Sequence, residues 1–338
     1  MKNLAEATAH CRPSAFADIA VRNVHPWFRT RPDSILCAMV TDPALGSVPA
    51  DPATTRGRQD EEILHRYDRP VAFYVWATVL PWAFWFAAAY LSHLPEQNQI
   101  VLVATLALSL AGLFAPLAVV FALVRHRPEL RADIVNRLKW PSSARWPFLV
   151  AAVFLVPVTL MAAQGLSLFF GYDPGQFRLR GGFTFSTGLM PVWVTLIGAA
   201  VIEELAWHSY GTDTLVRKMR VFSASMLFTL IWALWHVPLS FIDGYYQNEV
   251  VESGLLQTLN FPVSMVAFVL VMNWLYFRCG RSILIPVIFH ASANISAEIF
   301  MTHPDSKIIQ TGLMLFLSAI ILVKERRLFF DRPPRAVG

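Results

Sequence analysis

Long apolar runs separated by short polar loops fill the chain from residue 71 onward. A helix needs about 20 apolar residues to cross roughly 30 Å of hydrocarbon, and eight runs approach this length. They are residues 72–92, 100–124, 147–170, 188–207, 222–242, 256–277, 282–301 and 307–323. Polarity does not alternate along them as it does in membrane strands, and a helix satisfies its own backbone hydrogen bonds in lipid. The pattern therefore predicts an all-α fold, a polytopic membrane helix bundle with about eight transmembrane helices.

The first 70 residues have a different character. They contain 18 of the 51 Asp, Glu, Lys and Arg residues, nine acidic and nine basic, and no long apolar run. Segments of this kind bury too little apolar surface to compensate for the entropy lost on folding. We therefore expect residues 1–70 to be a cytoplasmic, largely disordered segment, within which Met39 is an alternative start.

Composition narrows the class of protein. The chain is 55% hydrophobic and 15% charged, whereas soluble domains carry about 25% charged residues, so a soluble enzyme is excluded. Its cysteines, Cys11, Cys37 and Cys279, are too scattered for a disulfide framework or a thiolate metal site. The net charge of +5 arises from Lys and Arg in short loops, which orient a membrane protein and do not indicate a nucleic-acid partner. The lipid bilayer is the expected partner.

Basic residues concentrate in alternate loops. The basic loops are residues 125–145, 217–220, 278–281 and 324–327. The loops between them are acidic or poor in Lys and Arg, and Arg178 and Arg180, between the third and fourth runs, are the exception. Because cytoplasmic loops carry the excess of Lys and Arg, the pattern predicts a multi-pass protein with both termini in the cytoplasm.

Five polar side chains interrupt the apolar runs. Glu203 and Glu204 adjoin each other in the fourth run, His236 lies in the fifth, and His290 and Asn294 lie one helical turn apart in the seventh. A carboxylate inside a membrane helix costs about 2.5–3.5 kcal/mol. These groups therefore avoid that cost only if they converge in a wet cavity within the bundle.

This set of groups suits hydrolysis by an activated water. A glutamate accepts a proton from water, a histidine orients the water or donates to the leaving amine, and an amide with a second histidine binds an oxyanion. Glu203, His236 and His290 would also suit Zn²⁺ or another divalent metal, although the chain contains no HExxH. Two alternatives stay open: the fourth helix ends at Ala200 and its glutamates face water, and Glu298 is a solvated helix end.

Three short motifs carry a resemblance to a known family. EELAWH begins at Glu203, WALWH ends at His236, and HASAN begins at His290. Their order and spacing resemble the EExxxR, FxxxH and HxxxN motifs of the CPBP intramembrane proteases, also called the ABI family, which include the CAAX prenyl endopeptidases. The resemblance implies a CPBP-like catalytic core at residues 188–325, preceded by N-terminal transmembrane helices at residues 71–187.

The resemblance also assigns roles to the motif residues. It makes the catalytic set Glu203 as general base, Glu204 as its support, His236 in water activation, and His290 and Asn294 in stabilising the tetrahedral intermediate. Two positions depart from the motifs, because Trp232 replaces Phe and His208 replaces Arg. By resemblance both are substrate-binding positions, and a protonated His208 would hold either a glutamate or a substrate carboxylate.

The function implied by the resemblance is that of an intramembrane endopeptidase of the cell inner membrane. We expect it to cleave a membrane-associated protein or peptide, lipidated or not, at a site that opens toward the cytoplasm. The family is named for metalloproteases, and a metal-free glutamate mechanism also fits its motifs. His208 in place of Arg leaves open a catalytically impaired member that acts as an immunity or scaffold protein. Buried Glu and His also occur in proton-coupled transporters, which is a further alternative.

Overall fold

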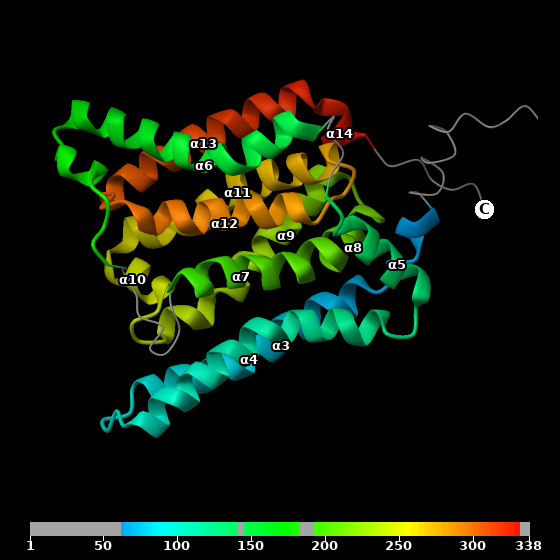
Figure 1. Cartoon of the computed structure of the whole chain (residues 1–338), viewed down its shortest axis with the longest axis horizontal. Coiled ribbons are helices and arrows are strands. Elements are labelled where there is room, and N and C mark those ends of the chain that lie inside the picture. The colour runs from blue at the N-terminus through cyan, green and yellow to red at the C-terminus, as the bar shows by residue number, and fades with distance from the viewer. Residues whose placement is uncertain (1–61, 141–144, 183–191, 332–338) are drawn as a thin grey trace, which may run out of the picture. The chain divides into compact units, whose positions relative to one another are not determined.

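The described part of the chain is almost wholly helical. The computed structural model describes residues 62–140, 145–182 and 192–331. Within these ranges the predicted apolar runs form helices, and the only extended pairing is an isolated bridge between Leu179 and Phe300. The predicted all-α fold is confirmed (Figure 1).

Six segments of the described residues are long and apolar enough to cross a membrane. They are α3 (Pro70–Ser92), α4 (Gln99–Val124), α6 (Trp146–Ser167) with its extension to Phe170, α9 (Val221–Trp235) with its extension to Phe241, α11 (Leu255–Arg278) and α13 (Pro304–Lys324). The two remaining predicted runs form the shorter helices α7 (Val192–Ala206) and α12 (Leu284–Ile299). The chain is a multi-pass membrane protein, and α7 and α12 carry the first and third motifs.

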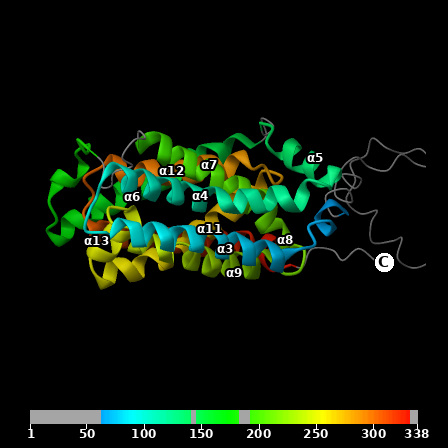
Figure 2. The ribbon, with the colours of Figure 1, turned by 90° about the horizontal axis from the view of Figure 1, so that it is seen from below.

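Helices α3 and α4 lie side by side along one face of the bundle (Figure 1, Figure 2). The pair packs through α4 on α7 and through α3 on α9. Helix α7 contacts α12, α12 contacts α6, and α6 contacts α13, while α11 packs on both α13 and α9. The three motif-bearing helices α7, α9 and α12 are thereby held between the α3–α4 pair and the outer helices α6 and α13.

A glycine permits the close approach of α3 and α4. A Cβ at Gly112 would lie 2.2 Å from Nε1 of Trp85, and this Nε1 donates a hydrogen bond to the Ser109 carbonyl at 3.0 Å. The Trp85 ring packs edge-on against Trp235, with 4.5 Å between centroids. The α3–α4 pair is therefore attached to the end of α9, one residue before His236.

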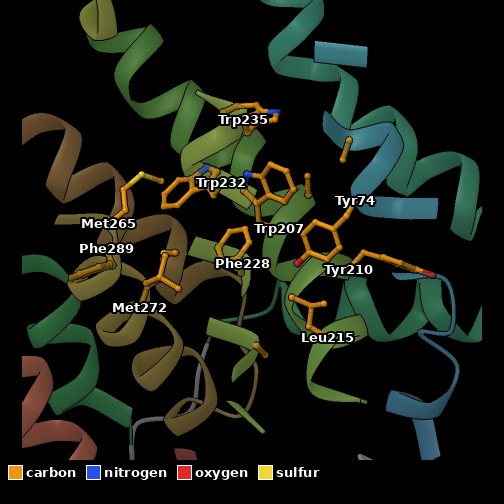
Figure 3. Packing of buried hydrophobic residues seen from close by; sticks show 14 of the residues in the cluster. Tyr74, Trp207, Tyr210, Leu215, Phe228, Trp232, Trp235, Met265, Met272 and Phe289 are labelled. Carbon is orange, nitrogen blue, oxygen red and sulfur yellow. The ribbon is translucent and has the colours of Figure 1, made fainter. Parts of the chain in front are cut away.

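Aromatic side chains fix α9 against the end of α7 (Figure 3). Trp207 begins a π-helical turn, Trp207–Gly211, which continues α7. Its ring lies 5.5 Å from that of Phe228 and 6.3 Å from that of Tyr74, and Phe228 stacks on Trp232 at 5.5 Å. Large rings of this kind dominate core energetics, so this packing sets where Trp232 lies relative to the glutamate pair.

The two ends of the bundle differ in charge. Helices α5 (Pro128–Arg137), α8 (Thr212–Val216) and α14 (Arg326–Phe330) lie at one end, which holds the basic loops (Figure 1). Helix α10 (Tyr246–Glu252), at the opposite end, is acidic. We refer to these as the basic end and the α10 end.

Arg137 is not one of the exposed orienting charges that its loop position suggests. The structure buries it to 7% exposure, and its guanidinium donates to the carbonyl oxygens of His208 at 2.9 Å and Ser209 at 2.7 Å. It also pairs with Asp213 at 2.9 Å. A π-helical turn disrupts the regular backbone pairing, and buried carbonyls need donors, so Arg137 supports the turn that follows the paired glutamates of α7.

The N-terminal segment joins this end of the bundle. Residues 1–61 of the stretch predicted to be disordered lie outside the described residues. Beyond them Tyr67 is fully buried; its hydroxyl donates to Asp133 at 2.6 Å, and Thr214 donates to its carbonyl at 2.8 Å. The last residues before α3 are therefore an ordered part of the membrane body.

Candidate active site

The paired glutamates leave α7 in different directions. Successive residues of an α-helix are about 100° apart at 3.6 residues per turn, so the side chains of Glu203 and Glu204 point to different sides of α7. Glu203 is 7% exposed and lines a cavity, whereas Glu204 is fully buried behind it. The alternative in which α7 ends at Ala200 is wrong, because the helix continues to Ala206.

Glu204 binds two histidines. One carboxylate oxygen accepts a hydrogen bond from Nδ1 of His290 at 2.8 Å, and the other contacts Nδ1 of His208 in a short hydrogen bond. On its other side, His208 Nε2 lies 3.0 Å from the Asn273 side-chain oxygen, and the amide nitrogen of Asn273 donates to Ser225 at 2.8 Å. His208 thus contacts the Glu204 carboxylate through one ring nitrogen and the Asn273 side-chain oxygen through the other. It occupies the position that the first motif gives to Arg.

Trp232 holds the other glutamate. Its indole Nε1 donates to Oε2 of Glu203 at 3.0 Å. The ring also lies 5.4 Å from that of His236 and 5.5 Å from that of His290. Phe at this position of the second motif has no donor, so Trp232 adds a hydrogen bond that the motif residue could not make.

In each histidine that lines the cavity, one ring nitrogen forms a hydrogen bond within the protein. Nδ1 of His236 donates to the Trp232 carbonyl at 2.7 Å, as Nδ1 of His290 does to Glu204. Hydrogen bonding at one ring nitrogen fixes the orientation of the other. Both rings line the cavity, so in both the Nε2 atom is the one left for chemistry.

The cavity has a volume of about 300 Å³ and brings together five of the seven predicted site residues. These are Glu203, Trp232, His236, His290 and Asn294. The amide nitrogen of Asn294 donates to the Leu196 carbonyl at 3.0 Å, which leaves its second N–H for a ligand. The convergence expected from the cost of burying these groups is what the structure shows.

Two expectations need correction. The substrate-binding role predicted for His208 does not fit its position, because it is fully buried beside Glu204 and does not line the cavity. Glu204, predicted to support Glu203, does not line the cavity either and accepts a hydrogen bond from His290. Glu298 is not a solvated helix end: it is 2% exposed and lines the cavity.

The sequence reasoning also missed residues that complete the site. Asn273 is an amide within the apolar run of α11, and this isolated polarity was a usable signal. Tyr245, Gln310 and Thr311 line the cavity from the α10 end, but polar residues near helix ends are ordinary in sequence. Nothing local distinguishes them.

The predicted metal ligands do not assemble into a metal site. Across the residues that the structure describes, no group of three or more His, Cys, Asp or Glu could hold a metal ion. Glu203, His236 and His290 line the same cavity without forming such a group.

The cavity extends toward the α10 end. Its lining continues from the catalytic groups to Tyr246 and Gln247 of α10 and to Gln310 of α13. The basic loops lie at the opposite end. The predicted opening of the site toward the cytoplasm and the predicted cytoplasmic location of the basic loops both stay predictions.

The fold and the site define a polytopic membrane protein with a buried cluster of glutamates and histidines around one cavity. A family model described as "Type II CAAX prenyl endopeptidase Rce1-like" matches residues 185–296. Over 265 residues the chain is 32% identical to "CAAX prenyl protease 2" of Methanococcus maripaludis, which covers 78% of this chain and 96% of the relative. The chain belongs to the Rce1-like CAAX prenyl endopeptidase family, and the resemblance to the CPBP intramembrane proteases is confirmed. As a class it is an intramembrane endopeptidase whose substrate is membrane-associated.

Proposed function

We propose that the protein hydrolyses a peptide bond of a membrane-associated protein or peptide by means of a water molecule activated by Glu203. The observation that carries this proposal is the arrangement of Glu203, His236 and His290 around one cavity, with Trp232 fixing the glutamate at 3.0 Å. A carboxylate and two imidazoles in hydrogen-bonding reach of a bound water are the usual parts of general acid–base catalysis.

In the proposed reaction the water oxygen attacks the carbonyl carbon of the scissile bond while Glu203 accepts a water proton. His236 orients the water through Nε2. Asn294 and His290 stabilise the negative charge that develops on the carbonyl oxygen, the contribution that is usually the largest in such reactions. Glu203 then delivers its proton to the leaving nitrogen as the C–N bond breaks, which restores the carboxylate.

Glu204 and His208 support this reaction without touching the substrate. Glu204 fixes the orientation of the His290 ring, and His208 balances the charge of Glu204. Because His208 already makes the carboxylate contact that an Arg would make, the substitution gives no specific support to an impaired immunity or scaffold protein. Membership of a peptidase family likewise favours proteolysis over proton-coupled transport.

We place the protein in the cell inner membrane with both termini in the cytoplasm, as the loop charge indicates. The cavity is then reached from the non-cytoplasmic face. In a variant without the native cysteines, a membrane-impermeant maleimide added to intact cells should label Ser253→Cys, which is exposed next to α10, but not Asn136→Cys, which is exposed at the basic end. Labelling of Asn136→Cys alone would reverse the orientation.

Cleavage by purified variants tests the proposed function. The probe is an internally quenched peptide ending in S-farnesylcysteine, two valines and serine, the sequence type for which the M. maripaludis relative is named. Glu203→Gln and His290→Ala should each abolish cleavage without loss of folded protein. The control is Glu252→Gln, which replaces an exposed glutamate of α10 by glutamine. This variant should cleave normally. Turnover unchanged in both site variants would refute the proposal.

A further inference from the structure

A second cavity of about 260 Å³ adjoins the catalytic one. Phe261, Ser264, Ala293 and Gln310 line both cavities, so the two share a wall. Ala293 is the residue next to Asn294 on α12. A peptide segment extending from a bond held at Glu203 could therefore enter the second cavity without leaving the protein.

Two cationic side chains line this second cavity. Arg180 comes from the loop before α7, and Lys307 comes from the first turn of α13. The cavity also contains one carboxylate, that of Glu249 on α10. The lining of this cavity therefore carries a net positive charge, although the loops at this end of the bundle otherwise contain few Lys or Arg residues.

The two cationic side chains do not form ion pairs with other described residues. Among the described residues, neither Arg180 nor Lys307 lies in a salt bridge. Nε of Arg180 is buried without a hydrogen-bond partner, and Nη2 makes a long contact of 3.5 Å to the Phe300 carbonyl. The Lys307 ammonium lies 5.6 Å from the centroid of the Tyr246 ring. A buried donor without a hydrogen-bond partner costs free energy. An anionic ligand that accepts a hydrogen bond from Nε of Arg180 would remove this cost.

Backbone hydrogen bonds fix the position of Arg180 relative to α12. Its backbone N–H donates to the Ile299 carbonyl at 2.9 Å, and the Met301 N–H donates to the Arg178 carbonyl at 3.0 Å. These bonds tie the loop to the end of α12, the helix that carries His290. A group bound at Arg180 would therefore sit at a fixed distance from the hydrolytic centre.

We propose that Arg180 and Lys307 are the residues that bind the free C-terminal carboxylate of the substrate segment released by cleavage. A guanidinium matches a carboxylate geometrically, and an ammonium adds a point charge. This role would also explain why Arg180 occurs in a loop where the charge pattern predicts few Lys or Arg residues. This inference rests on the proposed endopeptidase function, because the segment bound here is the leaving part of the substrate.

Peptide binding tests the inference separately from turnover. The full chain carrying Glu203→Gln is titrated with the farnesylated peptide described above, made with either a C-terminal carboxylate or a C-terminal carboxamide. We expect the acid to bind about tenfold or more tightly than the amide, as for loss of a hydrogen bond to a charged group. Adding Arg180→Gln or Lys307→Gln should bring this ratio close to one while leaving binding of the amide unchanged, which also shows that the variants are folded.

Arg178→Gln is the matched control, because it removes the same charge from the same loop at an exposed position outside the cavity. It should keep the preference for the acid. Equal binding of acid and amide by the parent, or an equal loss of preference with Arg178→Gln, would overturn the inference. Loss of the preference when phosphatidylglycerol vesicles are added would assign the cations to a lipid headgroup and also overturn it. Failure of the wild type to cleave either peptide would count against the proposed function alone.

Discussion

Replacing Glu204 by Gln separates the roles of the two adjacent glutamates. Both Glu204 oxygens accept hydrogen bonds, one from His290 at 2.8 Å and one from His208. Gln keeps one oxygen but presents an NH₂ group in place of the other, so one of the two histidine bonds is lost or one ring must change its tautomer. Loss of a hydrogen bond to a charged group costs about 1.5–3 kcal/mol. At 1.4 kcal/mol for each factor of ten, this predicts a fall in kcat of roughly 10- to 150-fold.

The assay measures kcat and KM for the farnesylated peptide, together with the melting temperature of the purified protein. We expect kcat to fall with little change in KM, because Glu204 does not line the cavity. Glu203→Gln should instead be inactive. An inactive but folded Glu204→Gln would show that Glu204 is itself the base, and an unchanged kcat would show that its hydrogen bonds do not position His290.

Three further outcomes follow from the structure. His208→Arg should keep cleavage near the wild-type rate while His208→Leu lowers it, because the position needs a hydrogen-bond donor to the Glu204 carboxylate; a sharp gain in His208→Arg would instead support an impaired wild type. Arg137→Met should reduce the free energy of unfolding by about 1.5–3 kcal/mol or more, since it removes the charged donors of the buried His208 and Ser209 carbonyls, while Arg281 still pairs with Asp213. The exposed Arg131→Met on the same helix is its control, and equal melting temperatures for the two would contradict this role. Treatment with 1,10-phenanthroline should leave turnover unchanged, because the site groups of the described residues form no three-ligand set; inhibition reversed by Zn²⁺ would contradict the metal-free scheme.

Much of the fold could be predicted because apolar length is a local property of the chain. The convergence of Glu203, His236 and His290 could also be predicted, since isolated polar groups in lipid have few stable alternatives. Long-range geometry could not. The direction of Glu204 depends on how α7 is rotated against α12, and no spacing within EELAWH reports that rotation.

The burial of a charged side chain is the second feature that could not be predicted from the sequence. Arg137 lies in a loop rich in Arg and Lys, and its neighbours in sequence do not distinguish it from the exposed Arg131. It is buried because the π-helical turn after Trp207 presents carbonyl oxygens that need donors, and that turn has no signature in the apolar pattern. Trp232 was expected to be a substrate-binding position, and the hydrogen bond of its indole nitrogen to Glu203 could not be predicted from the motif.

The central claim is that Glu203 activates the water that breaks the peptide bond. Its most direct test is mass spectrometry of the peptide products formed in H₂¹⁸O by purified wild type and by Glu203→Gln. We predict that the wild type releases two fragments, the N-terminal one carrying a single ¹⁸O atom in its new carboxylate, and that Glu203→Gln releases neither. Products formed at the wild-type rate by Glu203→Gln would contradict the account.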